Sequence, residues 1–357
     1  MSRKFQIWLA RINVNKGADM SSSRSFQLLF LNQRDLDSID VSPDEILKAV
    51  EDGLRQHGLR QVVLPPKSHL DLEQRYCGHF NILKGYVPSI EVAGIKVVGD
   101  YVLNYRHQLP SEIGLLTLYH PETGMPFAIV EATKTTWMRT GAVTAIGAKY
   151  LARPDSRIIA HIGARGTARY NILMLSHLFQ MEEIRVISKR AESRDRLVKD
   201  LREEHGLPAR GANSYEEAVK GADIVVDSTR LEAPAVLIHR EWLKPGSLLI
   251  PYGWVMSIDP QIPFMVDKLV VDDWKQCCEG GQLYPLISSG KLTERHLYGE
   301  MGEIVAGQKP GRETPEEQIL FWHRGFAISD IMIGYLYYQK AKKQGLGQPL
   351  GIFGREE

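Results

Sequence analysis

One stretch, residues 158–178, constrains the fold more than any other. It reads IIAHIGARGTARYNILMLSHL: an apolar strand runs into a glycine turn, and the turn opens a helix. Doubly wound parallel sheets use this order to present the N-terminal amides of a helix to the pyrophosphate of a dinucleotide. The turn is irregular, because a G-x-G-x-x-A turn beginning at Gly163 requires glycine at 165, where this chain has Arg165. The stretch therefore predicts a Rossmann-type α/β fold and leaves open whether a cofactor binds.

The residues of this turn have separate expected roles. Gly163 supplies the tight turn, Gly166 keeps a backbone amide accessible, and Ala168 allows the helix to pack closely on the strand. Arg165 either obstructs the pyrophosphate or binds it through its guanidinium. The candidate cofactor-binding residues of the turn are Gly163, Arg165, Gly166, Thr167 and Ala168. The alternative is a Rossmann-like domain that no longer binds a cofactor.

The residues after the second strand bear on the choice of nucleotide. A carboxylate there would accept hydrogen bonds from the adenine ribose of NAD. This chain instead has Ser188, Lys189 and Arg190, and a hydroxyl beside two cations suits a 2′-phosphate. The sequence therefore favours NADP over NAD, although the same residues can be simply the basic start of a surface helix. Thr229, after the strand ADIVVD, is a further cofactor-binding candidate.

Composition excludes several other classes of protein. The 357 residues carry a net charge of +1, which suggests neither nucleic acid nor an anionic membrane as a partner. No apolar run approaches the roughly 20 residues that span a bilayer. Residues 1–24 predict a loose leader rather than a secretion signal, and we expect a cytoplasmic protein. Three cysteines make no disulfide framework, and without a C-x-x-C or H-E-x-x-H spacing we expect no metal site.

The order of elements predicts two domains. Residues 25–138, with 316–357, should form an α+β domain for substrate binding and dimerisation, and 139–315 should form the Rossmann dinucleotide-binding domain. In the first, Ser42 and Pro43 start a helix, residues 94–102 and 113–120 are strands, and PETG is a hairpin turn. After 139, strands and helices alternate as in a parallel sheet. The pattern over 319–345 predicts a long helix that ends at Gly345 and packs back on the first domain.

Three cations form a second group of candidates. Lys67 follows two prolines, Lys96 lies in an apolar strand where an unpaired ammonium is costly, and Arg139 is expected near the start of the helix that joins the domains. Cations near a domain interface suit a substrate carboxylate, which arginine can bind through two parallel hydrogen bonds. Each residue taken alone can equally be a solvated or structurally paired charge.

Other polar side chains have weaker signals. Asp272 and Asp273 end the strand KLVVDD, at the sheet edge where ligands bind, so that one of them either faces the cofactor or caps the next helix. We assign Asp273 to the cofactor as a candidate. Four aromatic side chains are possible pocket residues, although a single histidine is more often structural: His69, His79, His107 and Trp254.

Taken together, these motifs resemble the ornithine cyclodeaminase/mu-crystallin family over almost the whole chain. The matching pieces are PPK at 65–67, GIKVVG around Lys96, HPETGMPFAIVEAT, RTGAVTAIGAKYLA from Arg139, LVVDDWKQC and GEMGEIVAGQKPGRE at 299–313. DDWKQC and the PGRE that follows resemble the branch that oxidatively splits an amino-acid adduct into diaminopropionate and 2-oxoglutarate. The resemblance implies a homodimer in which Lys96 and Arg139 bind the substrate carboxylate and are catalytic. It also implies that Lys67 assists them and that Lys96 polarises or protonates an imine.

Two departures from the family pattern concern the substrate. Cyclodeaminases carry a catalytic aspartate in a G-G-D-x-P-G turn, where this chain has YGWVM at 252–256. They also carry a glutamate two residues before a Met-Pro pair, where this chain has ILKG at 82–85. A diamine needs anions near its distal ammonium, whereas this pocket offers tryptophan and Lys84, which we add as a candidate substrate-binding residue. A substrate with a second carboxylate or an apolar end fits better.

These observations support three readings. The first is an NAD(P)-dependent dehydrogenase or imine reductase that acts on an amino acid or an N-substituted amino acid. The second is an ammonia lyase of the ornithine cyclodeaminase type, which recycles its cofactor in each turnover. The third is a non-catalytic small-ligand binder of the mu-crystallin kind; Arg165 supports it, and the retained Lys96 and Arg139 count against it.

Overall fold

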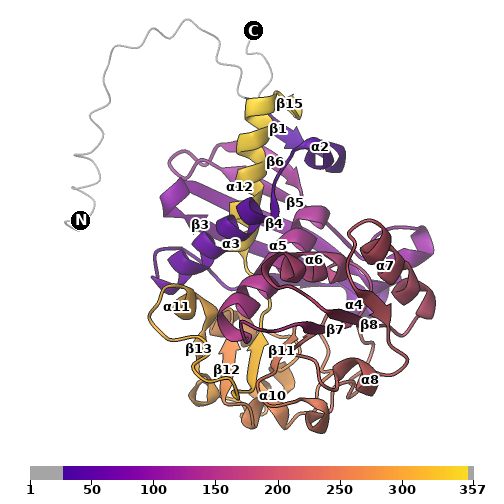
Figure 1. The fold of residues 1–357 in the computed structure, drawn as a ribbon. Coiled ribbons are helices and arrows are strands. Elements are labelled where there is room, and N and C mark those ends of the chain that lie inside the picture. The colour runs from indigo at the N-terminus through magenta and orange to yellow at the C-terminus, as the bar shows by residue number, and fades with distance from the viewer. Residues whose placement is uncertain (1–26, 353–357) are drawn as a thin grey trace, which may run out of the picture.

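The computed structural model describes residues 27–352, and its strands form two sheets. The predicted leader at 1–24 lies outside the described residues. In Figure 1 one sheet, with the yellow helix α12 (Ala327–Gln344), occupies the upper part of the molecule, and the other, from dark red to orange, occupies the lower part. None of the helices in the described part of the chain is long and apolar enough to cross a lipid bilayer.

The first sheet has seven strands. In sheet order they are β15 (Gln348–Gly351), β1 (Gln27–Leu31), β6 (Pro126–Glu131), β5 (Glu112–Tyr119), β4 (Val92–Tyr101), β3 (Gly78–Val87) and β2 (Ser68–Asp71). Only β1 and β6 pair in parallel. The β5–β6 hairpin confirms the PETG turn, which the Gly124 amide closes by donating to the His120 carbonyl. We call this sheet, with α3 (Pro43–Gly58) and α12, the mixed-sheet module.

The second sheet has eight strands, and every pairing in it is parallel. In sheet order they are β13 (Gly299–Glu300), β12 (Lys268–Val271), β14 (Ile319–Trp322), β11 (Leu248–Pro251), β10 (Ile224–Asp227), β7 (Ile158–Ile162), β8 (Glu183–Ile187) and β9 (Ala209–Gly211). The order reverses between β7 and β10, the position at which such sheets bind ligands. The predicted doubly wound sheet is therefore confirmed. We call this sheet and its helices the parallel-sheet module.

The remaining helices connect and cover these sheets. They are α2 (Gln33–Ser38), α4 (Glu73–Tyr76), α5 (Ala132–Leu151), α6 (Ala168–Leu178), α7 (Ala191–Glu203), α8 (Tyr215–Val219), α9 (Trp274–Cys277), α10 (Tyr284–Ser288) and α11 (Met301–Val305). Short 3₁₀ turns are η1 (Pro88–Ile90), η2 (Val102–His107), η3 (Arg240–Trp242), η4 (Ile262–Phe264) and η5 (Glu294–His296).

Helix α3 starts as the sequence predicts. Ser42 is the N-cap, and its hydroxyl accepts a hydrogen bond from the Glu45 amide while the Glu45 carboxylate accepts one from the Ser42 amide. This reciprocal capping box satisfies two backbone donors that the first turn would otherwise leave unpaired. The apolar side chains Ile46, Val50 and Leu54 then lie on one buried face, which packs towards α12 and α5.

The helix that joins the modules begins earlier than expected. Helix α5 starts at Ala132, where the Glu131 carboxylate caps the amides of Thr133 and Lys134. Arg139 therefore lies about two turns inside the helix rather than at its start. Because α5 is buried along most of its length, it has no amphipathic period that could mark its first turn in the sequence.

The long C-terminal helix predicted over 319–345 is wrong in its first part. Residues 319–322 form β14, in the middle of the parallel sheet between β11 and β12. Helix α12 begins only at Ala327, ends at Gly345 as predicted, and packs on β3, β4 and β5. The chain therefore returns to the mixed-sheet module after Trp322, rather than at the predicted boundary of 315/316. A four-residue apolar run carries no period that separates a buried strand from a buried helix.

Candidate active site

Two of the predicted cations meet on one buried carboxylate. The Lys96 ammonium on β4 donates to Asp330 Oδ1 at 2.6 Å, and Arg139 Nε on α5 donates to the same oxygen at 3.0 Å. Asp330 lies on α12, and each of the three side chains is at most 9% exposed. Lys96 also donates to the Thr136 hydroxyl at 3.1 Å, one turn before Arg139. The mixed sheet, α5 and α12 thus bring together charges that are far apart in sequence.

The ammonium of Lys96 has an altered acidity. Burial disfavours the charged form and lowers the pKa of Lys96 to about 8, although the negative charge of Asp330 acts in the opposite direction. A lysine with this pKa can hold a proton near neutral pH and can also release it.

Lys67 joins this group through the turn after β14. Its ammonium donates to the Arg324 carbonyl at 3.0 Å. A Cβ on Gly325, which has φ +69°, would lie 2.1 Å from Arg139 Nη1, so the glycine lets the turn approach Arg139. Burial, and then the charge of Arg324, hold the pKa of Lys67 well below its usual value, whereas Asp272 opposes this shift.

Asp272 fixes the position of that turn. It is fully buried at the end of β12, and its Oδ2 accepts hydrogen bonds from the backbone amides of Arg324 and Gly325 at 2.7 and 2.6 Å. Burial raises the pKa of Asp272 to about 6, while the charge of Lys67 acts against the rise. The carboxyl ends of β12 and β14 therefore present Arg324 beside the Lys67, Lys96 and Arg139 group.

An aromatic wall stands next to Arg324. The rings of His69, His79 and Trp254 lie 5.6–5.8 Å from one another, and the Arg324 guanidinium lies 4.8 Å from the Trp254 ring. Three of the four expected pocket aromatics are thus brought together. His107 is exposed at the end of η2 and does not join them.

Lys84 does not belong with the other cations, which corrects our prediction. It pairs with Ile95 across β3 and β4, whereas Lys96 pairs with Leu83. Because directly opposed residues of paired strands share a face and consecutive residues alternate, Lys84 lies on the outer face of the sheet and Lys96 on the face covered by α12. The Lys84 ammonium donates to the Ser68 hydroxyl at 2.7 Å.

The glycine turn has the geometry that a phosphate site requires. Gly163 has φ +98° and Gly166 has φ +57°, and a Cβ on Gly163 would lie 2.8 Å from Ser228 Oγ. Thr167 is the N-cap of α6 without a side-chain cap. The Ala168 amide donates to the Arg165 carbonyl at 3.2 Å, and the amides that follow it in the first turn stay available to an anion. The Thr167 hydroxyl instead bonds the Tyr252 hydroxyl at 2.5 Å, which ties α6 to the end of β11. Arg165 is exposed on this turn.

The residues after β8 lie where the sequence places them. Lys189 and Arg190 are exposed, and Arg190 is the N-cap of α7. The Arg190 guanidinium lies 5.6 Å from the ring of Tyr105 in η2, so the mixed-sheet module contacts this corner. Thr229 lies just after β10, and its buried hydroxyl has no hydrogen-bond partner within residues 27–352. A polar atom of this kind, beside glycines with positive φ, fits a bound dinucleotide.

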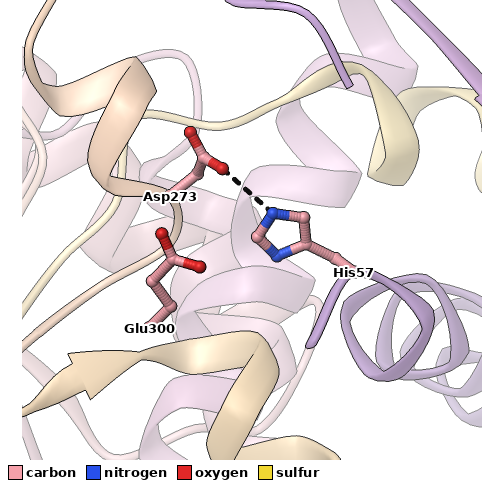
Figure 2. Close-up of side chains that lie close together, drawn as sticks. All are labelled: His57, Asp273 and Glu300. Atoms are coloured by element: carbon pink, nitrogen blue, oxygen red, sulfur yellow. Dashed lines mark hydrogen bonds and ion pairs between the residues drawn. The ribbon is translucent and has the colours of Figure 1, made fainter. Parts of the chain in front are cut away.

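Asp273 is engaged elsewhere, which corrects its assignment to the cofactor. Its Oδ1 caps α9 by accepting from the Gln276 amide at 2.8 Å, and its Oδ2 pairs with His57 Nε2 at 3.0 Å. Figure 2 shows this pair with Glu300 beside it. The Glu300 carboxylate accepts from the Trp274 amide and pairs with Arg60. We infer that His57, on α3, attaches this helix to Asp273 and Glu300 of the parallel-sheet module.

Two residues of this site, Asp330 and Arg324, were not predicted from the sequence. Asp330 lies in the stretch AISDIMIG, and an isolated acid in a run of buried apolar residues is the signal that could have revealed it. Arg324 lay inside the stretch interpreted as a helix, so its position at a strand end was hidden.

The fold and this group of residues define a Rossmann-type α/β protein with a buried cation group at the carboxyl end of its parallel sheet. The chain belongs to the ornithine cyclodeaminase/mu-crystallin family, whose model matches residues 29–345. The resemblance inferred from the sequence is thereby confirmed.

Individual relatives cover nearly the whole chain. N-((2S)-2-amino-2-carboxyethyl)-L-glutamate dehydrogenase of Staphylococcus aureus is 29% identical over 342 residues, which are 92% of this chain and 99% of the relative. The structure of Thermococcus litoralis Δ1-pyrroline-2-carboxylate reductase in complex with NADH and L-proline is 28% identical, with a TM-score of 0.85 and 90% and 100% of the two chains covered. An archaeal alanine dehydrogenase dimer with bound NAD is 30% identical, with a TM-score of 0.84 and 92% and 100% covered.

Proposed function

We propose that this protein is an NAD(P)-dependent oxidoreductase, a dehydrogenase or imine reductase that acts on an amino acid or an N-substituted amino acid. The observation that carries the proposal is the junction of Lys96 and Arg139 on Asp330, beside the carboxyl edge of a dinucleotide-type sheet. The three relatives described above are named as dehydrogenases or a reductase of amino acids, and two have NAD or NADH bound.

The residues of the site have separate roles in substrate binding and proton transfer. Arg139 and Lys96, assisted by Lys67, bind the substrate carboxylate and so orient the α-carbon. Lys96 also holds a proton beside the substrate nitrogen, which its pKa of about 8 permits. A bound nicotinamide would exchange hydride with that α-carbon.

The glycine turn would hold the dinucleotide. The positive φ of Gly163 and Gly166 leaves space where other residues would place a Cβ, and Ala168 begins the helix whose amides face the pyrophosphate. We assign Thr167, Thr229 and the Arg165 guanidinium to the same ligand. NADP is the favoured form, because Ser188, Lys189 and Arg190 offer no carboxylate and two exposed cations.

We further propose a homodimer that works in the cytoplasm. One relative of known structure is a dimer, and the outer face of the mixed sheet exposes apolar side chains such as Val97 and Leu115. The three cysteines are free thiols, as expected in a reducing compartment.

Calorimetric titration with NADP, NADPH, NAD and NADH is the first test. Tight binding of the phosphorylated pair supports the proposal and its NADP preference, and preference for NAD corrects only the nucleotide. If none of the four binds, Arg165 closes the site, and the reading as a mu-crystallin-like binder replaces the proposal.

Turnover is the second test. Nicotinamide absorbance is followed with a panel of amino acids, and with 2-oxo acids mixed with amines. A substrate-dependent change supports the proposal. Ammonia release from ornithine or lysine without net NADH or NADPH would instead show the cyclodeaminase-type lyase, for which the turn at Tyr252–Trp254 supplies no acid.

A further inference from the structure

The cation group of the site includes two half-buried side chains, Lys67 and Arg324, that have no ion pair to a carboxylate within residues 27–352. Lys96 and Arg139 share Asp330, and Arg139 adjoins Gly325. The carbonyl of Arg324, the residue before Gly325, accepts a hydrogen bond from the Lys67 ammonium, and the Arg324 amide donates one to Asp272. Asp330 therefore pairs with two of the four cations, whereas Asp272 accepts hydrogen bonds from backbone amides of the turn. A desolvated cation without such a partner either loses its proton, as the lowered pKa of Lys67 favours, or binds a counter-charge from elsewhere, and a guanidinium keeps its proton.

A neighbouring ion-pair group does not supply a partner for these two cations. Arg230, after β10, pairs with Asp100 at 2.6 Å and with Glu112 at 2.7 Å. These three side chains carry one negative charge in excess, but both carboxylates pair with Arg230 rather than with Lys67 or Arg324. Burial raises the pKa of Asp100, which weakens even this contribution.

Arg324 differs from Arg139 because its guanidinium has no carboxylate partner in the described part of the chain. Its Nη1 donates to the carbonyls of Gln276 and Gly280, and the group lies over the Trp254 ring. The structure gives its Nε and Nη2 no hydrogen-bond partner, and no ion pair to a carboxylate, within residues 27–352. Glycine at 281 keeps this space open, because a Cβ there would lie 2.6 Å from Arg324 Cδ. The guanidinium is therefore held in one orientation, and its Nε and Nη2 remain available as hydrogen-bond donors.

The side chains of the wall around Arg324 are imidazole, indole and amide groups, and the Glu73 carboxylate, which is 55% exposed, pairs with His79 Nδ1 at 3.1 Å rather than with Arg324. His69, His79 and Trp254 form the wall, together with Asn81, whose amide contacts His79 at 3.2 Å. Burial, and then the charges of Lys67 and Arg324, lower the pKa of His69 to about 4. A neutral imidazole next to a guanidinium can donate a hydrogen bond to an anion.

We propose that the substrate carries a second carboxylate, on its side chain or on its nitrogen substituent, and that Arg324 binds it. The first carboxylate occupies Lys67, Lys96 and Arg139, and the second lies against Arg324 and His69. Arg324 is then the residue that determines specificity for dicarboxylic amino acids and their imines. The inference rests on the proposed function, since it names the substrate class of that site.

Matched pairs of acids test the inference on the full chain. Succinate against butyrate, glutarate against valerate and adipate against hexanoate differ within each pair by one carboxylate. Each acid is titrated calorimetrically without nucleotide, with saturating NADPH and with saturating NADH. At least one dicarboxylate should bind about ten- to a hundredfold more tightly than its partner, as expected for a charged hydrogen bond. Equal affinity in all three pairs overturns the inference.

Substitutions locate the effect. Arg324→Met should remove the difference within the pair that discriminates while leaving the monocarboxylate affinity unchanged, and Arg324→Lys should keep part of it. Lys275→Met, which removes an exposed cation from α9 nearby, should change neither affinity. If Arg324→Met weakens both acids equally, Arg324 only supports the cation group and the inference falls. Should that variant not fold, the comparison of acids on the unaltered chain still decides.

The two proposals can fail separately. If nucleotides bind and turnover occurs but no dicarboxylate is preferred, only the substrate class is wrong. If no nucleotide binds, the oxidoreductase proposal is wrong, and the titrations without nucleotide still test whether Arg324 binds a second carboxylate.

Discussion

Asp330 contacts both Lys96 and Arg139, so one carboxylate fixes the position of two proposed substrate-binding cations. Its Oδ1 receives both hydrogen bonds, while its Oδ2 is buried without a hydrogen-bond partner in the described part of the chain. Removing this charge should therefore affect Lys96 more than Arg139, because the Lys96 ammonium lies closer to the carboxylate.

Asp330→Asn should lower the pKa of Lys96. Burial already lowers that pKa to about 8, and the Asp330 charge is the largest influence that raises it. Without that charge, Lys96 loses its proton at a lower pH, and carboxylate binding weakens from that pH upward. The fall of kcat/KM on the alkaline side should therefore move from near pH 8 to a pH lower by roughly one unit.

A pH profile of kcat/KM for the unaltered chain and the variant measures this shift. Asp37→Asn is the matched control, since it removes an exposed carboxylate that pairs with Lys134 on the same helix as Arg139. Superimposable profiles for Asp330→Asn and the unaltered chain would show that Asp330 does not govern Lys96.

Single residues also show what a sequence can predict about this site. Lys67, Lys96 and Arg139 were identifiable because buried or constrained cations are unusual and because their motifs resemble a family. Asp330 was not identifiable, because its contacts are with Lys96 and Arg139, which lie 234 and 191 positions away in the sequence. Lys84 was misplaced because its sheet face depends on the register with β4. A one-residue difference along a strand moves a side chain to the opposite face.

At the scale of elements, the junction of β8 and α7 should select the nucleotide. Lys189→Ala and Arg190→Ala should each weaken NADPH binding by about ten- to a hundredfold, since each removes a charged partner of a 2′-phosphate. NADH binding should change little. Calorimetry with both nucleotides measures the ratio, and Arg196→Ala, an exposed cation later on α7, serves as control. Equal losses for NADPH and NADH would argue against a 2′-phosphate site.

A second prediction at this scale concerns the packing of α3 against α11. A Cβ on Gly58 would lie 1.9 Å from the Gly302 carbonyl oxygen, and the obstacle is backbone that cannot rotate away. Gly58→Ala should therefore cost about 1–3 kcal/mol of unfolding free energy or more, despite the better helix propensity of alanine. Gly53→Ala on the same helix meets only the side chains of Met332 and Ile328, at 3.1 and 3.2 Å. Its cost should be clearly smaller in urea denaturation, and equal costs would contradict the close backbone contact.

Elements differed in how far the sequence predicted them. The strand–turn–helix at 158–178 and the capped helix α3 were correct because turn and cap chemistry are local. Strand β14 was not predicted because its four buried residues lie between β11 and β12, and strand pairing is set by tertiary contacts. Asp273 caps α9, which was the alternative to cofactor binding that the sequence left open for this residue.

At the scale of the whole molecule, the two faces of the mixed sheet differ in how far they are covered. Helix α12 covers one face, where Lys96 lies. On the other face, Val97 pairs with Leu115 and is followed by Ile95 and Ile113 on the neighbouring positions of the same side. These four side chains are 40–48% exposed. A hollow of about 390 Å³, lined by Val63, Tyr86 and Ile95 among others, adjoins them. Apolar patches of this kind mark interaction surfaces.

We expect a second copy of the chain to cover this face, and a charge placed there should separate the copies. Val97→Lys and Leu115→Lys should each raise the dimer dissociation constant by about a hundredfold or more, because an unpaired ammonium would be buried in the interface. Val236→Lys alters an equally exposed apolar residue, at 43%, in the parallel-sheet module and should leave the dimer intact. Sedimentation velocity over a range of concentrations measures the assembly, and a monomeric unaltered chain would refute the prediction. Lys96 lies on the opposite face of the sheet from Val97, so the separated chains should still bind nucleotide, which distinguishes loss of the interface from loss of the fold.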